Sequence, residues 1–358
     1  MLIRFIRRIL ERIDRLLLPL ASASGLLASA YYLLLNPRFR REHRAVLAGR
    51  LAYERGLDAT AQSSPLLRRN VHRLEKGLVM RPRQPVFAED YIGETVAALL
   101  TAEQSGRLDP GEHKWARDVL TEYFTAVSDT PCIARARRRF MQRPTSGGTI
   151  AAVRADTEAA AATTWSPRAR AHGVRSGVDF EAFFALCQQR RSVRWFRAEP
   201  VPRELVLKAV QAAAQAPSAC NRQPFLFRYF ERGEDARRIA GIAMGTAGYS
   251  DNIPALVVVL ADLSSFPHER DRHVAYIDAS LAAMQFMLAL ETLELASCPI
   301  NWPDVEALER RMERELGLSR HLRPVMLIAL GYADPQGGVP FSAKKPAELL
   351  LRLDDDYS

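Results

Sequence analysis

Two short apolar runs in the second half of the chain constrain its fold more than any other feature. Residues 254–261 read PALVVVLA, and residues 325–332 read VMLIALGY. Each run has the length of a strand and is apolar on both faces, which indicates strands that lie buried inside a layered domain. Pro224 opens a third expected strand at residues 225–230.

Helices are expected around these strands, at residues 179–190, 203–215 and 272–296. Pro202 enters the second of them, a position at which proline is tolerated. Helices that alternate with few, widely spaced strands predict an α/β or α+β layer fold. In the long third helix, five apolar residues at helical spacing are expected to face inward, namely Val274, Ile277, Leu281, Met284 and Leu288.

Length and charge divide the chain into unlike halves. The 358 residues suggest two or more domains. Residues 1–178 hold 29 Lys and Arg against 17 Asp and Glu, a net charge of +12, whereas residues 179–358 hold 21 against 24, a net charge of −3. The basic half suits an anionic partner such as a membrane surface. Nucleic acid is not the expected partner, because no recognisable DNA- or RNA-binding module accompanies the charge.

The N-terminal residues 1–36 combine basic and apolar character. Residues 1–18 have the pattern of an amphipathic helix with arginines opposite an apolar stripe, and residues 16–35 carry no charge. Twenty uncharged residues can cross a bilayer, but a proline, a glycine and several serines dilute this stretch. Three interpretations stay open: a membrane span, an in-plane or re-entrant segment, and a soluble helical pair. We expect a cytoplasmic protein, with attachment to the inner face of an anionic membrane through residues 1–45 as the open alternative.

Residues 37–130 are predicted to be mostly helical, and residues 131–178 are predicted to form a linker or arm. The latter region has few large apolar residues to offset the entropic cost of ordering it. No metal site is expected, because the four cysteines form no CxxC motif and His72 and Glu75 are a single pair. The expected helices of the helical region cover residues 38–56, 65–77, 89–105 and 110–127.

Three guanidinium groups and a hydroxyl gather where the helix at 179–190 ends. They belong to Arg190, Arg191, Ser192 and Arg194. Neighbouring arginines repel one another unless an anion neutralises them, and their forked donors match phosphate. The segment therefore indicates an anion site, although arginines are also common at helix C-termini for dipole reasons alone.

A second polar segment joins the helix at 203–215 to the strand at 225–230. Two prolines stiffen it, and Ser218, Asn221 and Gln223 offer hydrogen-bond donors and acceptors at close range. Such a loop can read the polar edge of a cofactor, while the same residue types also occur in ordinary helix-to-strand turns.

Together the two segments resemble the FMN-dependent nitroreductase family. In that family an Arg-x-Ser-x-Arg/Lys stretch is followed, after an intervening helix, by a Ser-x-x-Asn-x-Gln-Pro-aromatic loop. Here Arg190–Arg194 and Ser218–Phe225 have the same order and spacing. The resemblance covers residues 179–355. It implies an α+β, three-layer fold with a central, mostly antiparallel sheet flanked by helices, preceded by the mostly helical N-terminal region.

The resemblance also implies which residues bind the cofactor. From the first two segments these are Arg190, Arg191, Ser192, Arg194, Pro217, Ser218, Asn221 and Gln223. In the family a proline-centred loop near residue 299 places a backbone N–H beside flavin N5, which maps to Pro299, Ile300 and Asn301, and the adjacent Trp302 would narrow substrate access. A basic pair near the end of the domain approaches the FMN phosphate, which maps to Lys344 and Lys345.

By the same resemblance the chain is a flavin-dependent oxidoreductase that takes hydride from NADH or NADPH through FMN. The acceptor stays open: a nitroaromatic, a quinone-like compound or another small molecule. No catalytic side chain is expected, because such chemistry needs positioning and charge stabilisation more than a side-chain acid or base.

Family members are typically intertwined homodimers with FMN at the subunit interface. The resemblance therefore implies that Pro217, Ser218 and Asn221 reach the cofactor held by Arg190, Ser192 and Arg194 of a second copy. The basic, apolar N-terminus motivates an alternative function, a membrane-peripheral scaffold whose flavin domain is degenerate.

Overall fold

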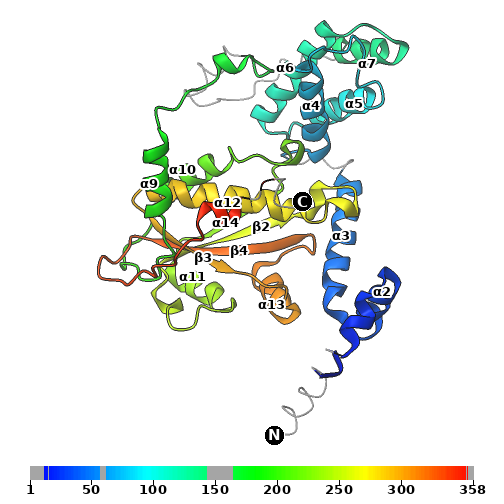
Figure 1. Cartoon of the computed structure of the whole chain (residues 1–358). Coiled ribbons are helices and arrows are strands. Elements are labelled where there is room, and N and C mark those ends of the chain that lie inside the picture. The colour runs from blue at the N-terminus through cyan, green and yellow to red at the C-terminus, as the bar shows by residue number, and fades with distance from the viewer. Residues whose placement is uncertain (1–11, 15, 57–61, 143–163, 352, 354–358) are drawn as a thin grey trace.

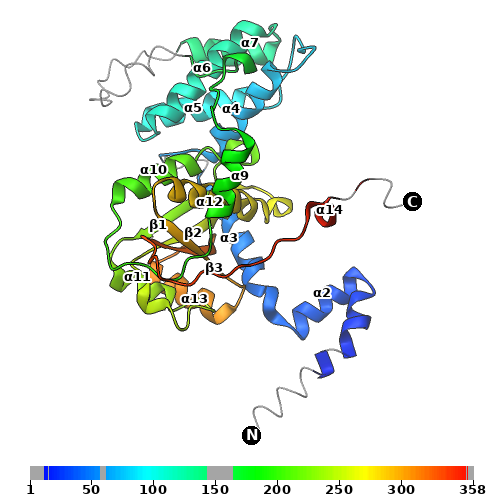
Figure 2. The same ribbon diagram turned by 60° about the vertical axis from the view of Figure 1, so that its left-hand side comes forward.

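The computed structural model describes residues 12–14, 16–56, 62–142, 164–351 and 353. Figures 1 and 2 show a sheet domain in the middle, a bundle of helices above it and a short helical segment that projects below it. The long helix α3 (Arg40–Gly56) runs from the projecting segment along the side of the sheet domain towards the bundle (Figure 1).

Four antiparallel strands form the sheet, in the order β1-β2-β4-β3. They are β1 (Phe225–Phe230), β2 (Ala255–Asp262), β3 (Ala296–Asn301) and β4 (Leu322–Gly331). The two apolar runs pair in the centre as β2 and β4, with Val257 opposite Ile328. The antiparallel sheet of the predicted α+β fold is thus confirmed.

Alternate residues of β2 explain why its sequence is apolar throughout. Val257 and Val259 pack against α10 (Arg203–Ala213) and α12 (Val274–Thr292) on one face. Leu256 and Val258 pack on the other face, which α11 (Gly233–Ala240) and α13 (Glu306–Leu316) cover. A strand covered on both faces needs apolar side chains at every position. The result is the predicted arrangement of three layers.

The orientation predicted for α12 is wrong. Ile277, Leu281 and Met284 are exposed, and Val274 and Leu288 are only partly buried. The face on the sheet and on α10 is built mainly from small residues, because small side chains let α12 approach its neighbours closely. These inward residues are Ala275, Ala279, Ala282, Ala283, Phe286 and Leu290.

Four helices form the bundle around a core of their own: α4 (Pro65–Leu78), α5 (Ile92–Ser105), α6 (Pro110–Ala126) and α7 (Pro131–Met141). Three of these helices begin with the same signal, a capping side chain followed by proline at the first helical position. The cap of α7 is Thr130, and its Ile133 and Phe140 are buried in the bundle core. The prediction of a linker or arm is therefore wrong for residues 131–141, which form the last helix of the bundle.

α3 fixes the N-terminal part of the chain to the sheet domain. Arg41 forms ion pairs of 2.9 Å with both Glu309 and Glu313 of α13. Two turns later α3 crosses Leu263 so closely that a Cβ at Gly49 would lie 2.8 Å from the backbone oxygen of Leu263. The expected helix at 38–56 is thus present. Gly49 is required in it because α3 approaches the backbone of Leu263 closely.

The uncharged stretch at residues 16–35 is not one helix. Residues 16–22 are helical, the helix ends at Ala23, and α2 (Gly25–Leu34) begins anew with Ser24 as its N-cap. The amphipathic helix predicted for residues 1–18 falls mostly outside the described residues. Within the described part of the chain, one helix is long and apolar enough to cross a membrane, Glu269–Thr292, and it contains the core helix α12.

Short elements complete the structure. These are η1 (Pro37–Phe39), η3 (Arg170–His172), α9 (Phe180–Gln189), η4 (Ala219–Asn221), η5 (Ser250–Asn252), η6 (Leu263–Ser265), η7 (Glu269–Asp271) and α14 (Ala347–Leu350). After β4 the chain leaves the sheet domain as an extended arm that ends in α14 (Figure 2).

Candidate functional site

The arginine-rich segment lies along the edge of the sheet. It follows α9, and Ser192 forms a parallel bridge with Ser297 of the outer strand β3. The backbone N–H of Val193 donates to the carbonyl of Ser297 at 3.0 Å. The structure thus brings the arginine-rich segment next to the strand that contains Pro299, although the two are about a hundred residues apart in the sequence.

Polar atoms without hydrogen-bond partners gather at this junction. Among the described residues, nothing bonds Arg190 Nε, Ser297 Oγ or Glu291 Oε1, and all three atoms are buried. Burial also raises the pKa of Glu291, an effect that Gln189 and Arg190 partly oppose. Buried polar atoms nearly always find a partner, so three of them together indicate a place for a ligand or ordered water.

Arg194 contributes a second cation at the same edge. Its guanidinium lies 5.7 Å from the ring centroid of Tyr249, and its carbonyl accepts a 2.7 Å hydrogen bond from Asn252. Burial raises the pKa of the neighbouring thiol of Cys298, which Arg194 and Arg190 partly oppose. The edge therefore presents two arginines and a neutral thiol.

Arg191, which was also predicted to bind the cofactor, contacts the C-terminal arm. Its guanidinium donates to the carbonyls of Pro340 and Phe341, so it holds the C-terminal arm against the sheet domain. Lys344 and Lys345 lie farther along this arm and are exposed. No described contact joins either lysine to Arg190 or Arg194.

The segment Pro299–Asn301 is a strand rather than the expected loop. It lies in β3 and pairs with β4, with Pro299 opposite Ile328. Proline is tolerated there because β3 is an outer strand of the four-stranded sheet. Trp302 was predicted to narrow substrate access, but it does not line an entrance. It is buried in the core beneath α13, where its indole N–H donates to Glu309.

The second predicted segment forms a tight loop between α10 and β1. Cys220, Asn221 and Gln223 all have positive φ, at 53°, 51° and 50°. Gln223 N donates to Ser218 Oγ at 3.0 Å, and Ala219 N donates to an Asp278 carboxylate oxygen at 3.0 Å. Three non-glycine residues in the left-handed region cost energy, and such strain concentrates at binding sites.

A residue that sequence reasoning missed holds this loop from outside the domain. Arg68 of α4 donates to the Asn221 carbonyl at 2.7 Å and to Gln223 Oε1 at 2.9 Å. Its third nitrogen pairs with the buried carboxylate of Glu112 at 3.0 Å. Nothing in the sequence distinguishes Arg68 from Arg69 or Arg73. Its role is evident only from its contact with Asn221, which lies 153 residues later in the chain.

Arg222, which lies inside the same loop, is also buried. Burial lowers its pKa, and its guanidinium lies 4.8 Å from the ring centroid of Phe266. Its Nε has no partner among the described residues. Asp278 is buried nearby, and burial raises its pKa while Ala219 N–H and Arg222 oppose the shift.

The two groups of predicted residues lie at opposite ends of α12. The loop contacts Asp278 in the first turns of the helix, whereas Gln189 bonds Glu291 in the last turn at 3.4 Å. Thirteen residues of α-helix separate these contacts, roughly 20 Å at 1.5 Å per residue. Within one copy of the chain the structure therefore keeps the loop and the arginine edge apart (Figure 1).

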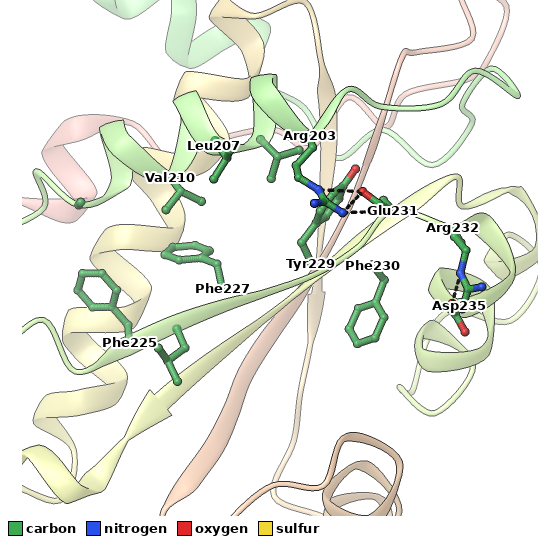
Figure 3. Close-up of a pocket in the computed structure, with 13 residues that line it drawn as sticks. Arg203, Leu207, Val210, Phe225, Phe227, Tyr229, Phe230, Glu231, Arg232 and Asp235 are labelled. Atoms are coloured by element: carbon green, nitrogen blue, oxygen red, sulfur yellow. Dashed lines mark hydrogen bonds and ion pairs between the residues drawn. The ribbon is translucent and has the colours of Figure 1, made fainter. Parts of the chain in front are cut away.

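A groove on the far edge of the sheet is separate from both groups. It lies between β1 and α10, has a volume of about 610 Å³ and is floored by aromatic side chains such as Phe227 (Figure 3). Arg203 and Glu231 pair at 2.8 Å beside it. The groove contains none of the thirteen residues predicted to bind the cofactor.

The described residues hold no group of three or more His, Cys, Asp or Glu side chains arranged to bind a metal ion. The polar groups that the structure does bring together at the two candidate segments are arginines, backbone groups and the side chains of the strained loop.

Comparison with known proteins decides the family. The sequence model of the nitroreductase family matches residues 187–252 and 249–332. A protein of Methanothermobacter thermautotrophicus, provisionally named NADH dehydrogenase/NAD(P)H nitroreductase, is 31% identical over 146 residues, which cover 40% of this chain and 73% of that protein. The chain belongs to the nitroreductase family. Its second half is therefore a nitroreductase domain, the domain of an oxidoreductase.

Other members show how varied the names in this family are. An NADH dehydrogenase of Thermus thermophilus is 29% identical, over 42% of this chain and 85% of its own. Human iodotyrosine deiodinase 1 is 24% identical, over 48% of this chain and 68% of its own. Among solved structures, an FMN-dependent nitroreductase of Clostridium difficile is 23% identical, with a TM-score of 0.39, and covers 44% of this chain and 92% of its own.

Proposed function

We propose that the nitroreductase domain binds FMN and passes a hydride from NADH or NADPH to a small aromatic or quinone-like acceptor. The observation that carries the proposal is the junction of α9 and β3, where the buried Arg190 Nε and Ser297 Oγ have no partner among the described residues. A polar ligand with acceptor atoms supplies what these groups lack. Two arginines at one edge fit a ligand that carries an anionic phosphate and a polar ring.

When bound, FMN supplies the ring atom through which a hydride passes from the nicotinamide to the acceptor. This chain's residues provide the surroundings. Arg190 and Arg194 would hold the anionic part of the cofactor, either its phosphate or its reduced ring, by supplying positive charge. Ser218, Asn221 and the backbone of the strained loop supply short-range donors and acceptors. Both substrates would use one stacking site in turn, which predicts ping-pong kinetics.

We further propose that the site is completed by a second copy of the chain. α12 is apolar on nearly all sides, and such a helix is normally buried all round. Yet Ile277, Leu281 and Met284 form an exposed stripe along it. If two copies pack these stripes across a twofold axis perpendicular to α12, the two helices run antiparallel, and the loop of one copy moves toward the arginine edge of the other. In this arrangement the loop and the arginine edge of different copies lie closer together along the helix axis than the roughly 20 Å that separates the two groups of one copy.

The acceptor is proposed only by class. Three of the curated relatives are named as an NADH dehydrogenase, an NAD(P)H nitroreductase and an iodotyrosine deiodinase. A nitro group and the aromatic ring of iodotyrosine are the chemical features in the last two names, so nitroaromatics and quinones are the first compounds to test.

The experiment is an absorbance spectrum of the purified protein, with the heat-released cofactor identified by chromatography. We expect about one FMN per chain. The double variant Arg190→Ala/Arg194→Ala is expected to lose FMN while its circular dichroism is unchanged. Arg197→Ala/Arg203→Ala is the matched control, because both arginines are exposed and pair with surface glutamates.

Equal FMN content in the two double variants would show that the arginine edge is not the site. A colourless wild-type protein that FMN cannot reconstitute would reject the enzymatic function and favour a scaffold with a degenerate flavin domain.

A further inference from the structure

The helical segment before α3 carries an unusual density of exposed apolar side chains. Residues 16–22 and α2 together form what we name the apolar hairpin, residues 16–35. The hydroxyl of Tyr31 in α2 donates to the carboxylate of Asp14, so the second helix folds back beside the first. Eight leucines of the hairpin are exposed, and four of them, Leu16, Leu26, Leu33 and Leu34, show 66–82% of their surface.

Each of the three serine side chains of the hairpin makes a hydrogen bond within it. Ser22 Oγ donates to the Pro19 carbonyl at 3.0 Å, and Ser29 Oγ donates to the Gly25 carbonyl at 2.8 Å. Ser24 Oγ accepts from Leu27 N at 3.2 Å. Hydroxyls that need no water can enter an apolar medium at little cost, whereas unsatisfied ones cannot. This internal pairing distinguishes the hairpin from an ordinary leucine-rich surface.

Charge at the end of the hairpin selects the kind of surface it meets. Residues 16–35 carry no ionisable group except the tyrosines Tyr31 and Tyr32, and the chain then turns basic. Arg38 and Arg44 are exposed directly after it. Aromatic residues also gather there, since the rings of Tyr32 and Phe39 stack edge to face at 4.5 Å. Leucines flanked by tyrosines and arginines match the layers of an anionic membrane leaflet, from acyl chains to head groups.

The hairpin does not pack tightly on the rest of the protein. A cleft of about 770 Å³ separates α2 from α3 and the start of α12, with Tyr32 and Leu47 on its walls and Arg40 and Arg272 among its lining. Figure 2 shows α2 projecting away from the sheet domain. The sheet domain is thus not the partner that covers the leucines.

We propose that the apolar hairpin inserts into one leaflet of an anionic phospholipid bilayer and holds the enzyme at the membrane surface. It lies in the leaflet rather than across the bilayer. The ten residues of α2 are about 15 Å long at 1.5 Å per residue. That is half of the roughly 30 Å hydrocarbon core. The nitroreductase domain then faces the cytoplasm, where reduced nicotinamides are found.

The test is flotation of the full-length protein with vesicles of phosphatidylcholine alone and of phosphatidylcholine with 30–40% phosphatidylglycerol. We expect the wild type to float with the anionic vesicles. The variant Leu16→Gln/Leu26→Gln/Leu33→Gln/Leu34→Gln is expected to bind them at least 100-fold more weakly. The matched control is Leu207→Gln/Leu226→Gln, which replaces leucines 56% and 49% exposed at the far edge of the sheet. It should float like the wild type.

A charge variant separates electrostatic from apolar binding. Arg38→Gln/Arg44→Gln is expected to weaken binding to anionic vesicles about 25-fold, since each arginine at an anionic leaflet changes binding about fivefold. Binding to neutral vesicles should not change.

Two outcomes overturn the proposal. One is a leucine variant that floats as well as the control. The other is association of the protein without lipid, in which sedimentation shows a concentration-dependent oligomer that the leucine variant abolishes and vesicles do not compete with. The second outcome would assign the hairpin to a second copy of the chain. Neither result depends on FMN, because flotation is measured equally well on flavin-free protein.

Discussion

Replacing Arg68 by methionine tests how the helical bundle supports the nitroreductase domain. Methionine keeps most of the aliphatic length but donates no hydrogen bond. The change removes two bonds to the loop, to the Asn221 carbonyl and to Gln223 Oε1, and the ion pair with Glu112. A hydrogen bond that involves a charged group contributes about 1.5–3 kcal/mol. Removing one partner of a buried ion pair costs about 3–5 kcal/mol.

Glu112 limits the loss. Its carboxylate keeps a 2.7 Å bond from Ser63 Oγ and a 2.9 Å bond from Ser64 N after Arg68 is gone. We therefore expect the lower end of the range, a fall of about 3 kcal/mol in the free energy of unfolding of the bundle. The loop loses its outer support at the same time. If free protein must then reorder the strained loop to bind FMN, the dissociation constant rises 10- to 100-fold, which corresponds to about 1.4–2.8 kcal/mol.

The assay combines urea unfolding followed by circular dichroism with FMN titration followed by flavin fluorescence. Arg73→Met is the matched control on the same helix. Its guanidinium lies over the Tyr91 ring at 3.6 Å and pairs with the exposed Asp90, but it does not touch the loop. We expect a loss of about 1 kcal/mol and unchanged FMN affinity.

A lysine at position 68 separates the two effects. It keeps the charge opposite Glu112 but cannot bridge three acceptors as the guanidinium does. Arg68→Lys should thus recover much of the stability and little of the FMN affinity. If Arg68→Met binds FMN as tightly as the wild type, the reasoning is refuted, and Arg68 serves only to stabilise the bundle.

Three further predictions concern single positions. Gly49→Ala forces a methyl group against Leu263 and should lower the free energy of unfolding by about 1–3 kcal/mol, whereas Gly56→Ala, which meets no neighbour, should leave it unchanged or raise it; chemical denaturation checks both. Asp278→Asn should raise the melting temperature at pH 7 and not at pH 4. Burial raises the pKa of this carboxyl in the folded state, so the folded chain binds its proton more tightly, and the wild type loses stability as the pH rises above the ordinary aspartate range. An equal gain at both pH values would contradict that account. Among the four free cysteines, Cys298 is buried with a raised pKa and should be the last that iodoacetamide alkylates at pH 8, as peptide mass spectrometry can show.

The strands of the sheet domain could be predicted because their physical cause is local. β2 and β4 are covered on both faces, so β2 is apolar from Ala255 to Ala261 and β4 from Val325 to Leu330. The helix caps are equally local. Thr130 followed by proline is a start signal for α7, although the many arginines beyond it favour a linker when the sequence is taken alone.

The face of α12 could not be predicted from the same pattern. Periodicity places the largest apolar residues inward, but here alanines face the sheet and Ile277, Leu281 and Met284 face outward. Residues that a second copy of the chain would bury have the same apolar pattern in the sequence as residues of the core. β3 was mistaken for a loop because Pro299 interrupts it, and only its place at the sheet edge makes the proline acceptable.

The candidate site was predictable as motifs and not as a geometry. Arg190 and Arg194 are near Ser297 and Cys298 because Ser192 bridges to β3. The support from Arg68 and the holding of the arm by Arg191 depend on contacts between distant segments. Neighbouring arginines have the same local sequence environment, so no local pattern distinguishes these roles.

The contacts of α3 with the sheet domain fix both the position of this helix and its rotation about its own axis. Arg41, Ala45 and Gly49 meet the sheet domain at intervals of four residues, which is close to one turn of helix. One residue inserted into α3 between Arg41 and Gly49 would turn Arg41 by about 100° away from α13, whereas four residues would nearly restore its direction. The direction in which α3 carries the preceding segment therefore depends on the number of residues in α3, and changes in the length of this helix should be tolerated in steps of about one turn.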